Sequence, residues 1–297
     1  MTAQDLVKSV EGELANGGRK GIREVETAVS RAMRAAASAP SPRGRAMATY
    51  HTCVADGVSQ VAVRVGGRAV CVVDTARPRP MVRSAPEQEA RALWKKHFPQ
   101  EVSASWSDRR VLALIREAHA RLRARPEARA EAALLRALTS RRKGRASGAF
   151  ADVTPVTLPA QDGYPLEVPM PANGGDVARL GHADILARKG RGSGSRLCVV
   201  ELEATGGQAA AAPFRRGIRY AAFLRYLMRD DHSALHALTG LDRVPPVVVI
   251  AVVPEAGAGA ALDEKHLLEV APAEGIEELR VFTYRPQAGA LQVKPLA

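Results

Sequence analysis

The chain has 297 residues, of which 46% are apolar, and it carries a formal net charge of +12. This composition supplies enough apolar material for one large or two ordinary domains, and the charge favours an anionic partner such as nucleic acid, although a surplus of Arg and Ala also arises from GC-rich coding. No apolar run has the length of a membrane span, and the three cysteines lie far apart without CxxC spacing, which argues against a disulfide framework. We therefore expect a cytoplasmic protein that makes no membrane contact.

Residues 1–107 are expected to form a small N-terminal α/β accessory region. Residues 5–37 read as two helices broken at Asn16-Gly17-Gly18. Alternation of apolar and polar residues then predicts strands, two of them joined at Gly66-Gly67. The predicted strands are 50–54, 60–65 and 69–74, and a helix is predicted over 85–98. Substrate recognition, regulation, packing and oligomerisation all remain open as its role.

The positive charge is concentrated between Arg109 and Arg145, where twelve Lys and Arg face three Glu. Helices are predicted over 111–125 and 127–139, followed by a basic loop that contains Arg141, Arg142 and Lys143. Basic faces and loops of this kind neutralise phosphates, so we favour a nucleic-acid track here. The alternative is an ordinary solvated helix face.

Acidic residues interrupt two apolar stretches, 181–187 and 197–204, that read as strands joined by a Gly-rich turn. Because side chains alternate along a strand, Glu201 and Glu203 share one face of the second strand, and His182 and Asp184 share one face of the first. A hairpin would bring three carboxylates to one patch, where mutual repulsion favours a bound cation. A site made of a small number of hard oxygen ligands suits Mg²⁺. The alternatives are a solvated face, or acids paired with nearby Arg residues.

This pattern resembles the PD-(D/E)XK nuclease superfamily, in which an Asp on one strand and an ExK on the next precede a helix. Asp184 and Glu201-Leu202-Glu203 match these positions as an ExE variant. The resemblance implies an α/β fold with a restriction-endonuclease-like α-β-β-β-α-β core and a mixed central sheet, within a nuclease-like domain 108–297. The matching elements are helix 127–139, strands near 166, 184 and 200, helix 208–229 and strand 247–253.

The resemblance also implies a set of site residues. Asp184 and Glu201 would hold the metal, while Glu203 would bind a second ion or orient the attacking water. Glu131, on the helix before the core strands, is a further candidate metal ligand. Lys189 is a candidate substitute for the missing Lys, and His182 a candidate proton acceptor. Candidate nucleic-acid contacts on the helix after the motif are Arg215, Arg216, Arg219 and Tyr220, with packing an equal alternative for Tyr220.

The expected function is that of an endonuclease that uses Mg²⁺ or Mn²⁺ to hydrolyse DNA phosphodiester bonds, for example in restriction or phage defence. Two alternatives stand beside it. One is a DNA-binding module that has lost cleavage together with its Lys, and the other is an antibacterial DNase toxin. The sequence does not determine whether the substrate is DNA or RNA, or whether the protein forms a homodimer.

Overall fold

The computed structural model of the chain divides into two compact units. The first consists of Met1–Arg19, Arg129–Val156 and His182–Ala297, and the second of Lys20–Ala128 and Thr157–Gly181. The described residues are 1–37, 48–55, 58–65, 68–74, 79–121, 134, 141–142, 145–146, 150, 152–156, 166–167, 169–172, 176–182, 184–190, 194–203, 212–229, 233–270, 272–287 and 290–296. Both units are discontinuous in sequence, and the expected boundary near residue 107 stays a prediction.

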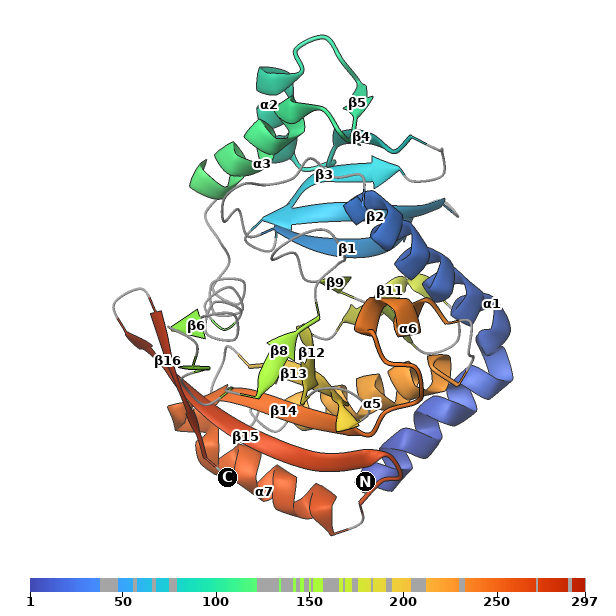
Figure 1. Cartoon of the computed structure of the whole chain (residues 1–297), viewed down its shortest axis with the longest axis vertical. Coiled ribbons are helices and arrows are strands. Elements are labelled where there is room, and N and C mark those ends of the chain that lie inside the picture. Colours follow the sequence, from blue (N-terminus) through green and yellow to red (C-terminus); the bar gives the residue numbers. More distant parts are fainter. Residues whose placement is uncertain are drawn as a thin grey trace. The chain divides into compact units, whose positions relative to one another are not determined.

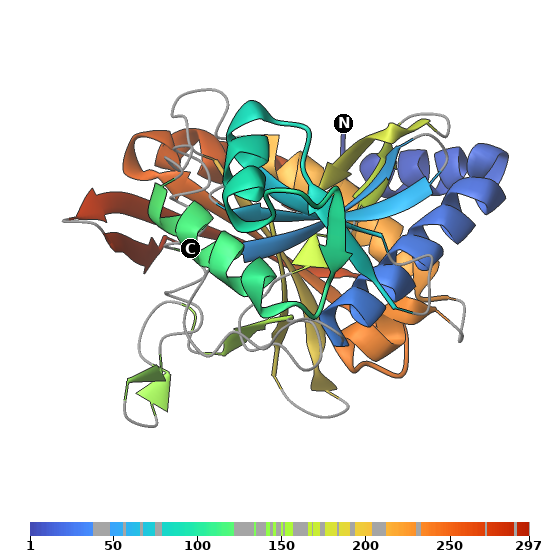
Figure 2. The ribbon, with the colours of Figure 1, turned by 90° about the horizontal axis from the view of Figure 1, so that it is seen from above.

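The second unit is built on a six-stranded sheet in the order β5-β4-β3-β2-β1-β9. Its strands are β1 Ala48–Ala55, β2 Val58–Val65, β3 Arg68–Asp74, β4 Met81–Ser84, β5 Ser103–Ser105 and β9 Leu166–Glu167. β2 and β3 pair as an antiparallel hairpin, as their alternating pattern predicts. The helices α2 (Gln88–His97) and α3 (Arg109–Arg121) contact each other and this sheet, and both are seen over the blue strands in Figure 2.

The first helix, α1, runs without interruption from Ala3 to Ala37. The predicted break at Asn16-Gly17-Gly18 is wrong. Gly lowers helix stability by only about 1 kcal/mol relative to Ala, and a long amphipathic helix tolerates such a cost. In the first unit its apolar stripe is buried through Leu6, Val10 and Leu14, which follow the spacing of a helical face.

The first unit contains a six-stranded mixed sheet in the order β16-β15-β14-β13-β12-β8. Its strands are β8 Val153–Pro155, β12 Ile185–Lys189, β13 Arg196–Leu202, β14 Val247–Pro254, β15 Ile276–Gln287 and β16 Ala290–Pro295. β8, β12 and β13 are antiparallel neighbours, whereas β13, β14 and β15 are parallel. Parallel neighbours need crossover connections, and α5 (Ala212–Leu227) and α7 (Ala258–Glu269) provide them. These two helices contact each other and the sheet (Figure 1).

The most apolar segments of this unit form its core. β14 is buried along almost its whole length, as expected for a parallel strand covered on both faces. α5 buries Phe214, Ile218, Ala221 and Leu224, which follow the spacing of one helical face. Pro213 lies in its first turn, where the missing N–H causes no loss.

The predicted strand near 166 does not join this sheet. β9 instead pairs in parallel with β1 in the second unit, and β8 takes the edge beside β12. The strand signal at 166–170 was correct, but local pattern cannot specify the partner. The predicted helix 127–139 lies outside the described residues except for Leu134.

Smaller elements complete the described fold. They are the two-stranded pairs β6 (Arg141–Arg142) with β7 (Arg145–Ala146) and β10 (Pro169–Ala172) with β11 (Asp176–His182), the helix α6 (Ala234–Thr239) and the 3-10 turn η3 (Glu255–Gly257). Among the described helices, none combines the length and apolar character that crossing a bilayer requires.

Candidate functional site

The hairpin of β12 and β13 brings two of the predicted acids together. The strands pair antiparallel with Ile185 opposite Val200, so Asp184 and Glu201 follow at the next position. Asp184 lies in the bend just before β12 rather than within one strand over 181–187, because β11 ends at His182. Its Oδ2 accepts a hydrogen bond of 2.6 Å from the backbone N–H of Leu202. That bond holds the carboxylate at the carboxyl end of β13.

Glu201 is an acid placed deep in the unit. Its side chain is only 2% exposed, and its Oε1 has no hydrogen-bond partner among the described residues. Burial raises the pKa of Glu201 well above its ordinary value, and the negative charge of Asp184 raises it further, while Arg216 opposes both effects. An ionised oxygen left unpaired in the interior is unfavourable, so this atom is a candidate ligand for a cation.

Arg216 of α5 is the counter-ion of the acid cluster, which we define as Asp184, Glu201 and Glu203. Its Nε lies 3.1 Å from Oε2 of Glu201, and its Nη1 lies 3.6 Å from Oε2 of Glu203. Burial lowers the pKa of Arg216, but the charges of the whole acid cluster outweigh this effect and leave it raised. Glu201 and Glu203 therefore share one guanidinium, and the charge of Asp184 also acts on it. With its side chain 46% exposed, Arg216 extends from the buried acid to solvent.

Gly217 allows α5 to approach the sheet at this point. A Cβ added there would lie 2.5 Å from Cγ1 of Val249 and 3.4 Å from Cγ of Glu201. The same added Cβ would lie 3.8 Å from Cγ1 of Val199, so Val199 and Glu201 share one face of β13. The absence of a side chain at 217 thus brings the neighbouring Arg216 within reach of the acids.

Glu203 follows the last residue of β13 and is anchored through its backbone. Its N–H donates to the carbonyl of Val252 at 2.9 Å, and its carbonyl accepts from the hydroxyl of Tyr284 at 2.9 Å. Burial raises the pKa of Tyr284, and the charge of Glu203 adds to this shift. These contacts fix the strand end on which Glu201 and Glu203 sit.

The other basic residues predicted at the site are engaged elsewhere. Lys189 lies five residues beyond Asp184, about 17 Å along a strand, and its Nζ is 2.9 Å from Glu278 and 3.7 Å from Asp152. It therefore does not replace the missing Lys at the acid cluster. Glu278 belongs to β15, so Lys189 ties β12 across the sheet to that strand.

The remaining side chains of α5 stabilise the unit. Arg215 contacts Glu264 of α7 at 2.6 Å, and Arg219 contacts Glu13 of α1 at 3.4 Å. Tyr220 is 2% exposed and lies 6.2 Å from Phe223, centroid to centroid. The packing alternative therefore applies to Tyr220, which is buried away from any nucleic-acid backbone.

Several predicted site residues cannot be placed around the acid cluster. Glu131 and Lys143 lie outside the described residues, and the side chains of His182, Arg141 and Arg142 do so as well, although their backbone belongs to β11 and β6.

The acid cluster offers a limited set of ligands for a cation. Within the described part of the chain, no group of three Asp, Glu, His or Cys side chains is arranged to hold a metal ion. The paired acids Asp184 and Glu201 still provide the hard oxygen ligands that Mg²⁺ prefers. The unpaired Oε1 of Glu201 fits such an ion, whereas Glu203 turns to Arg216. The fit is therefore to a site of two carboxylates rather than three.

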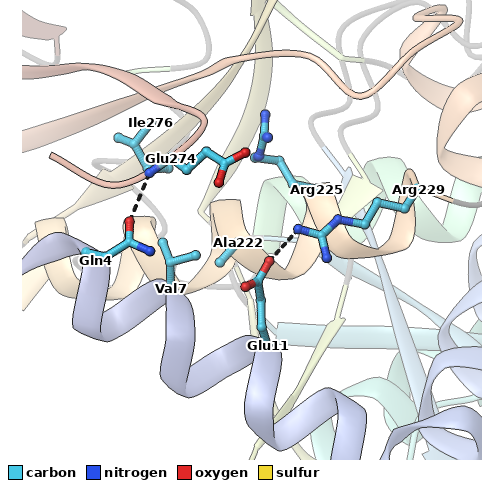
Figure 3. Close-up of a pocket in the computed structure, with 8 residues that line it drawn as sticks. All are labelled: Gln4, Val7, Glu11, Ala222, Arg225, Arg229, Glu274 and Ile276. Carbon is cyan, nitrogen blue, oxygen red and sulfur yellow. Dashed lines mark hydrogen bonds and ion pairs between the residues drawn. The ribbon is translucent and has the colours of Figure 1, made fainter.

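A separate hollow lies between the start of α1, α5 and the start of β15. Its volume is about 50 Å³, far below the roughly 300–1,000 Å³ of pockets that bind small molecules. Figure 3 shows the Glu11–Arg229 ion pair on one side and the bond from the N–H of Glu274 to Gln4 on the other. No member of the acid cluster lines it, so it belongs to the packing of α1.

Two residues of the site differ in how readily the sequence identifies them. Arg216 was expected on the helix after the motif, either as a nucleic-acid contact or as a support of the site, and pairing of the acids with nearby Arg residues was an alternative that named no particular residue. Tyr284 was missed, because it lies 81 residues from Glu203 and no local pattern connects the two.

Comparisons with protein-family models, with curated proteins and with solved structures found no match to this chain. Its function is therefore inferred from the site, the net charge and the order of the elements.

Proposed function

We propose that the chain is a nuclease that hydrolyses phosphodiester bonds of DNA and requires Mg²⁺ or Mn²⁺. The observation that carries this proposal is the position of Asp184 beside Glu201, whose buried Oε1 has no partner among the described residues. Two adjacent carboxylates at the end of a central strand are costly without a cation. The net charge of +12 supports an anionic substrate.

The order of elements around the acid cluster supports the restriction-endonuclease-like part of the proposal. Three antiparallel strands, β8, β12 and β13, are followed by α5 and by β14, which is parallel to β13. This order corresponds to the β-β-β-α-β portion of the expected core. β8 provides the strand that the sequence had assigned near 166.

Each residue of the cluster has a role in the proposed reaction. Asp184 and Glu201 would hold the cation, which when bound lowers the pKa of water and offsets developing charge on the phosphate. Leu202 keeps Asp184 oriented through its N–H. Arg216, the half-exposed cation at the site, would neutralise phosphate charge in place of the missing Lys, and Glu203 would orient its guanidinium.

A second candidate function is that of a DNA-binding module without cleavage. The contacts of Arg216 with both Glu201 and Glu203 favour it, because a guanidinium already compensates the acids and no metal is then needed. Such a module would retain the fold of a nuclease and bind DNA through exposed basic residues.

Incubation of the protein with supercoiled plasmid in Mg²⁺, Mn²⁺ or EDTA, beside a mobility-shift titration of duplex DNA, separates the two functions. The nuclease predicts nicked or linear plasmid only in the presence of a divalent ion. Intact plasmid together with tight binding would favour the binding module, and single-stranded RNA in the same assay tests the choice of nucleic acid. Absence of both binding and cleavage would contradict both functions.

A further inference from the structure

Three donor groups of Arg216 engage three oxygens at the end of β13. Besides its contacts to Glu201 and Glu203, its Nη2 lies 3.4 Å from the carbonyl oxygen of Leu202. Two carboxylates and a backbone carbonyl are also the kinds of oxygen that a divalent cation would use. The guanidinium and the proposed metal therefore share one ligand, the carboxylate of Glu201.

The positive charge of Arg216 is permanent. A guanidinium stays protonated at any pH at which a protein is folded, so this charge opposes an approaching cation under all ordinary conditions. Its side chain is 46% exposed, in contrast to 2% for Glu201. A long flexible stem with its head at the surface can move outward without disturbing the core.

The neighbouring Arg residues of α5 do not share this arrangement. Arg215 contacts Glu264 and Arg219 contacts Glu13, acids that lie on α7 and α1 and not in the cluster. Arg216 is thus the member of this trio that faces the site. Arg215 provides a matched control, since it is adjacent, has the same charge and is 45% exposed.

We propose that Arg216 occupies the place of the cation in the metal-free protein and competes with a divalent ion for Glu201. This inference rests on the proposed cation site and adds a regulatory step to it. Binding of the ion breaks the contact between Arg216 and Glu201 and releases the guanidinium towards solvent, where an anionic substrate can meet it. Metal affinity is consequently lower than the two acids alone would give.

Titration calorimetry with MnCl₂ at fixed pH and low salt tests this competition. R216A is expected to bind Mn²⁺ about tenfold to a hundredfold more tightly than the unaltered chain, the equivalent of one charged hydrogen bond that no longer has to be broken. R215A is expected to stay within about threefold of the unaltered chain, because Arg215 does not touch the cluster. D184N is expected to lose binding.

Thermal unfolding provides a second measurement that does not depend on activity. Without metal, R216A is expected to have a lower Tm, because the acids lose their counter-ion, and Mn²⁺ should raise its Tm by more than that of the unaltered chain. If R216A does not fold, R216Q serves the same purpose, since it keeps part of the hydrogen bonding without the charge.

Two results would overturn the inference. They differ in whether they also contradict the cation site and the proposed nuclease. Equal or weaker Mn²⁺ binding by R216A, with binding still lost in D184N, would refute the competition and leave the cation site in place. Absence of Mn²⁺ binding in both the unaltered chain and R216A would refute the cation site and the proposed nuclease with it.

Discussion

Arg216 donates its Nε–H to Glu201 across 3.1 Å, joining a half-exposed guanidinium to a carboxylate that is 2% exposed. A buried ion pair contributes little net stability, because desolvation offsets the attraction. One oxygen of this carboxylate also lacks a partner among the described residues. The pair is therefore better explained by function than by stability.

Replacement of Glu201 by Gln tests that explanation. E201Q keeps the shape of the side chain and removes its negative charge. Burial raises the pKa of the Glu201 carboxyl group well above its ordinary value. We expect the free energy of unfolding in EDTA to stay within about 1 kcal/mol or to increase, while Mg²⁺-dependent cleavage is lost. Denaturant unfolding and plasmid cleavage measure the two effects. A loss of several kcal/mol without loss of cleavage would assign Glu201 a structural role.

Gly217 is predicted to be needed for the close approach of α5. The added Cβ of G217A would lie 2.5 Å from Cγ1 of Val249, and overpacking of this kind lowers stability by about 1–3 kcal/mol. Gly259 of α7 is the matched control, because a Cβ there meets nothing within 4 Å. G259A should leave stability unchanged or raise it by up to about 1 kcal/mol. Equal effects of the two substitutions would contradict the close packing of α5 on β13 and β14.

Tyr284 is predicted to support the strand end that carries Glu203. Y284F removes the hydroxyl that donates to the Glu203 carbonyl at 2.9 Å, at a cost of about 1 kcal/mol in the free energy of unfolding. Y226F is the control, since the Tyr226 hydroxyl makes no hydrogen bond to a described residue and its ring lies beneath Arg229. Chemical denaturation of both variants is the measurement. A smaller loss in Y284F than in Y226F would show that this bond does not stabilise the fold.

The ionic contacts of Glu278 predict a dependence of stability on pH. Burial raises the pKa of Glu278, but hydrogen bonds from Arg280 and Lys189 outweigh it and leave this pKa below its ordinary value of 4.5. A carboxyl group with a lowered pKa stabilises the fold above its ordinary pKa and loses that contribution as pH falls through the folded value. The difference in unfolding free energy between the unaltered chain and E278Q should therefore shrink below about pH 4.5.

Urea titrations from pH 7 down to pH 3 would follow this difference. A difference that stays constant over the whole range would show that the lowered pKa of Glu278 does not contribute to folding. Repetition in about 1 M NaCl should reduce the difference for this half-exposed group, because salt screens such pairs.

The sequence predicted the local elements of this fold well where hydrophobic periodicity was clear. The hairpin of β2 and β3 and the strand β14 lie where the pattern placed them. The strand near 166 was detected too, but its pairing with β1 depends on contacts between residues more than 100 positions apart. The break in α1 was overpredicted from a Gly pair alone.

For the candidate site, too, the sequence predicted some contacts and could not predict others. The hairpin was expected to place Asp184 beside Glu201, and the pairing of Ile185 with Val200 does place them at the next position, whereas Glu203 contacts Arg216 and the three-acid site stays a prediction. The engagement of Lys189 by Glu278, and of Arg215 by Glu264, depends on strands and helices that the chain reaches 50 to 90 residues later. No periodicity encodes such pairs. Of the seven basic residues expected at the substrate, Arg216 is the one whose described side chain contacts the acids, and the side chains of Arg141, Arg142 and Lys143 lie outside the described residues.

The most direct test of the account is cleavage of an end-labelled DNA duplex in Mg²⁺ by the unaltered chain and by D184N. The amide oxygen of D184N can still accept the Leu202 N–H that Asp184 accepts at 2.6 Å, so folding and DNA binding should be retained while the cation ligand is lost. We predict labelled fragments from the unaltered chain, and none from D184N or in EDTA. Fragments at equal rates from both proteins, or none from either in Mg²⁺ or Mn²⁺, would contradict the assignment of Asp184 and Glu201 as the centre of a nuclease.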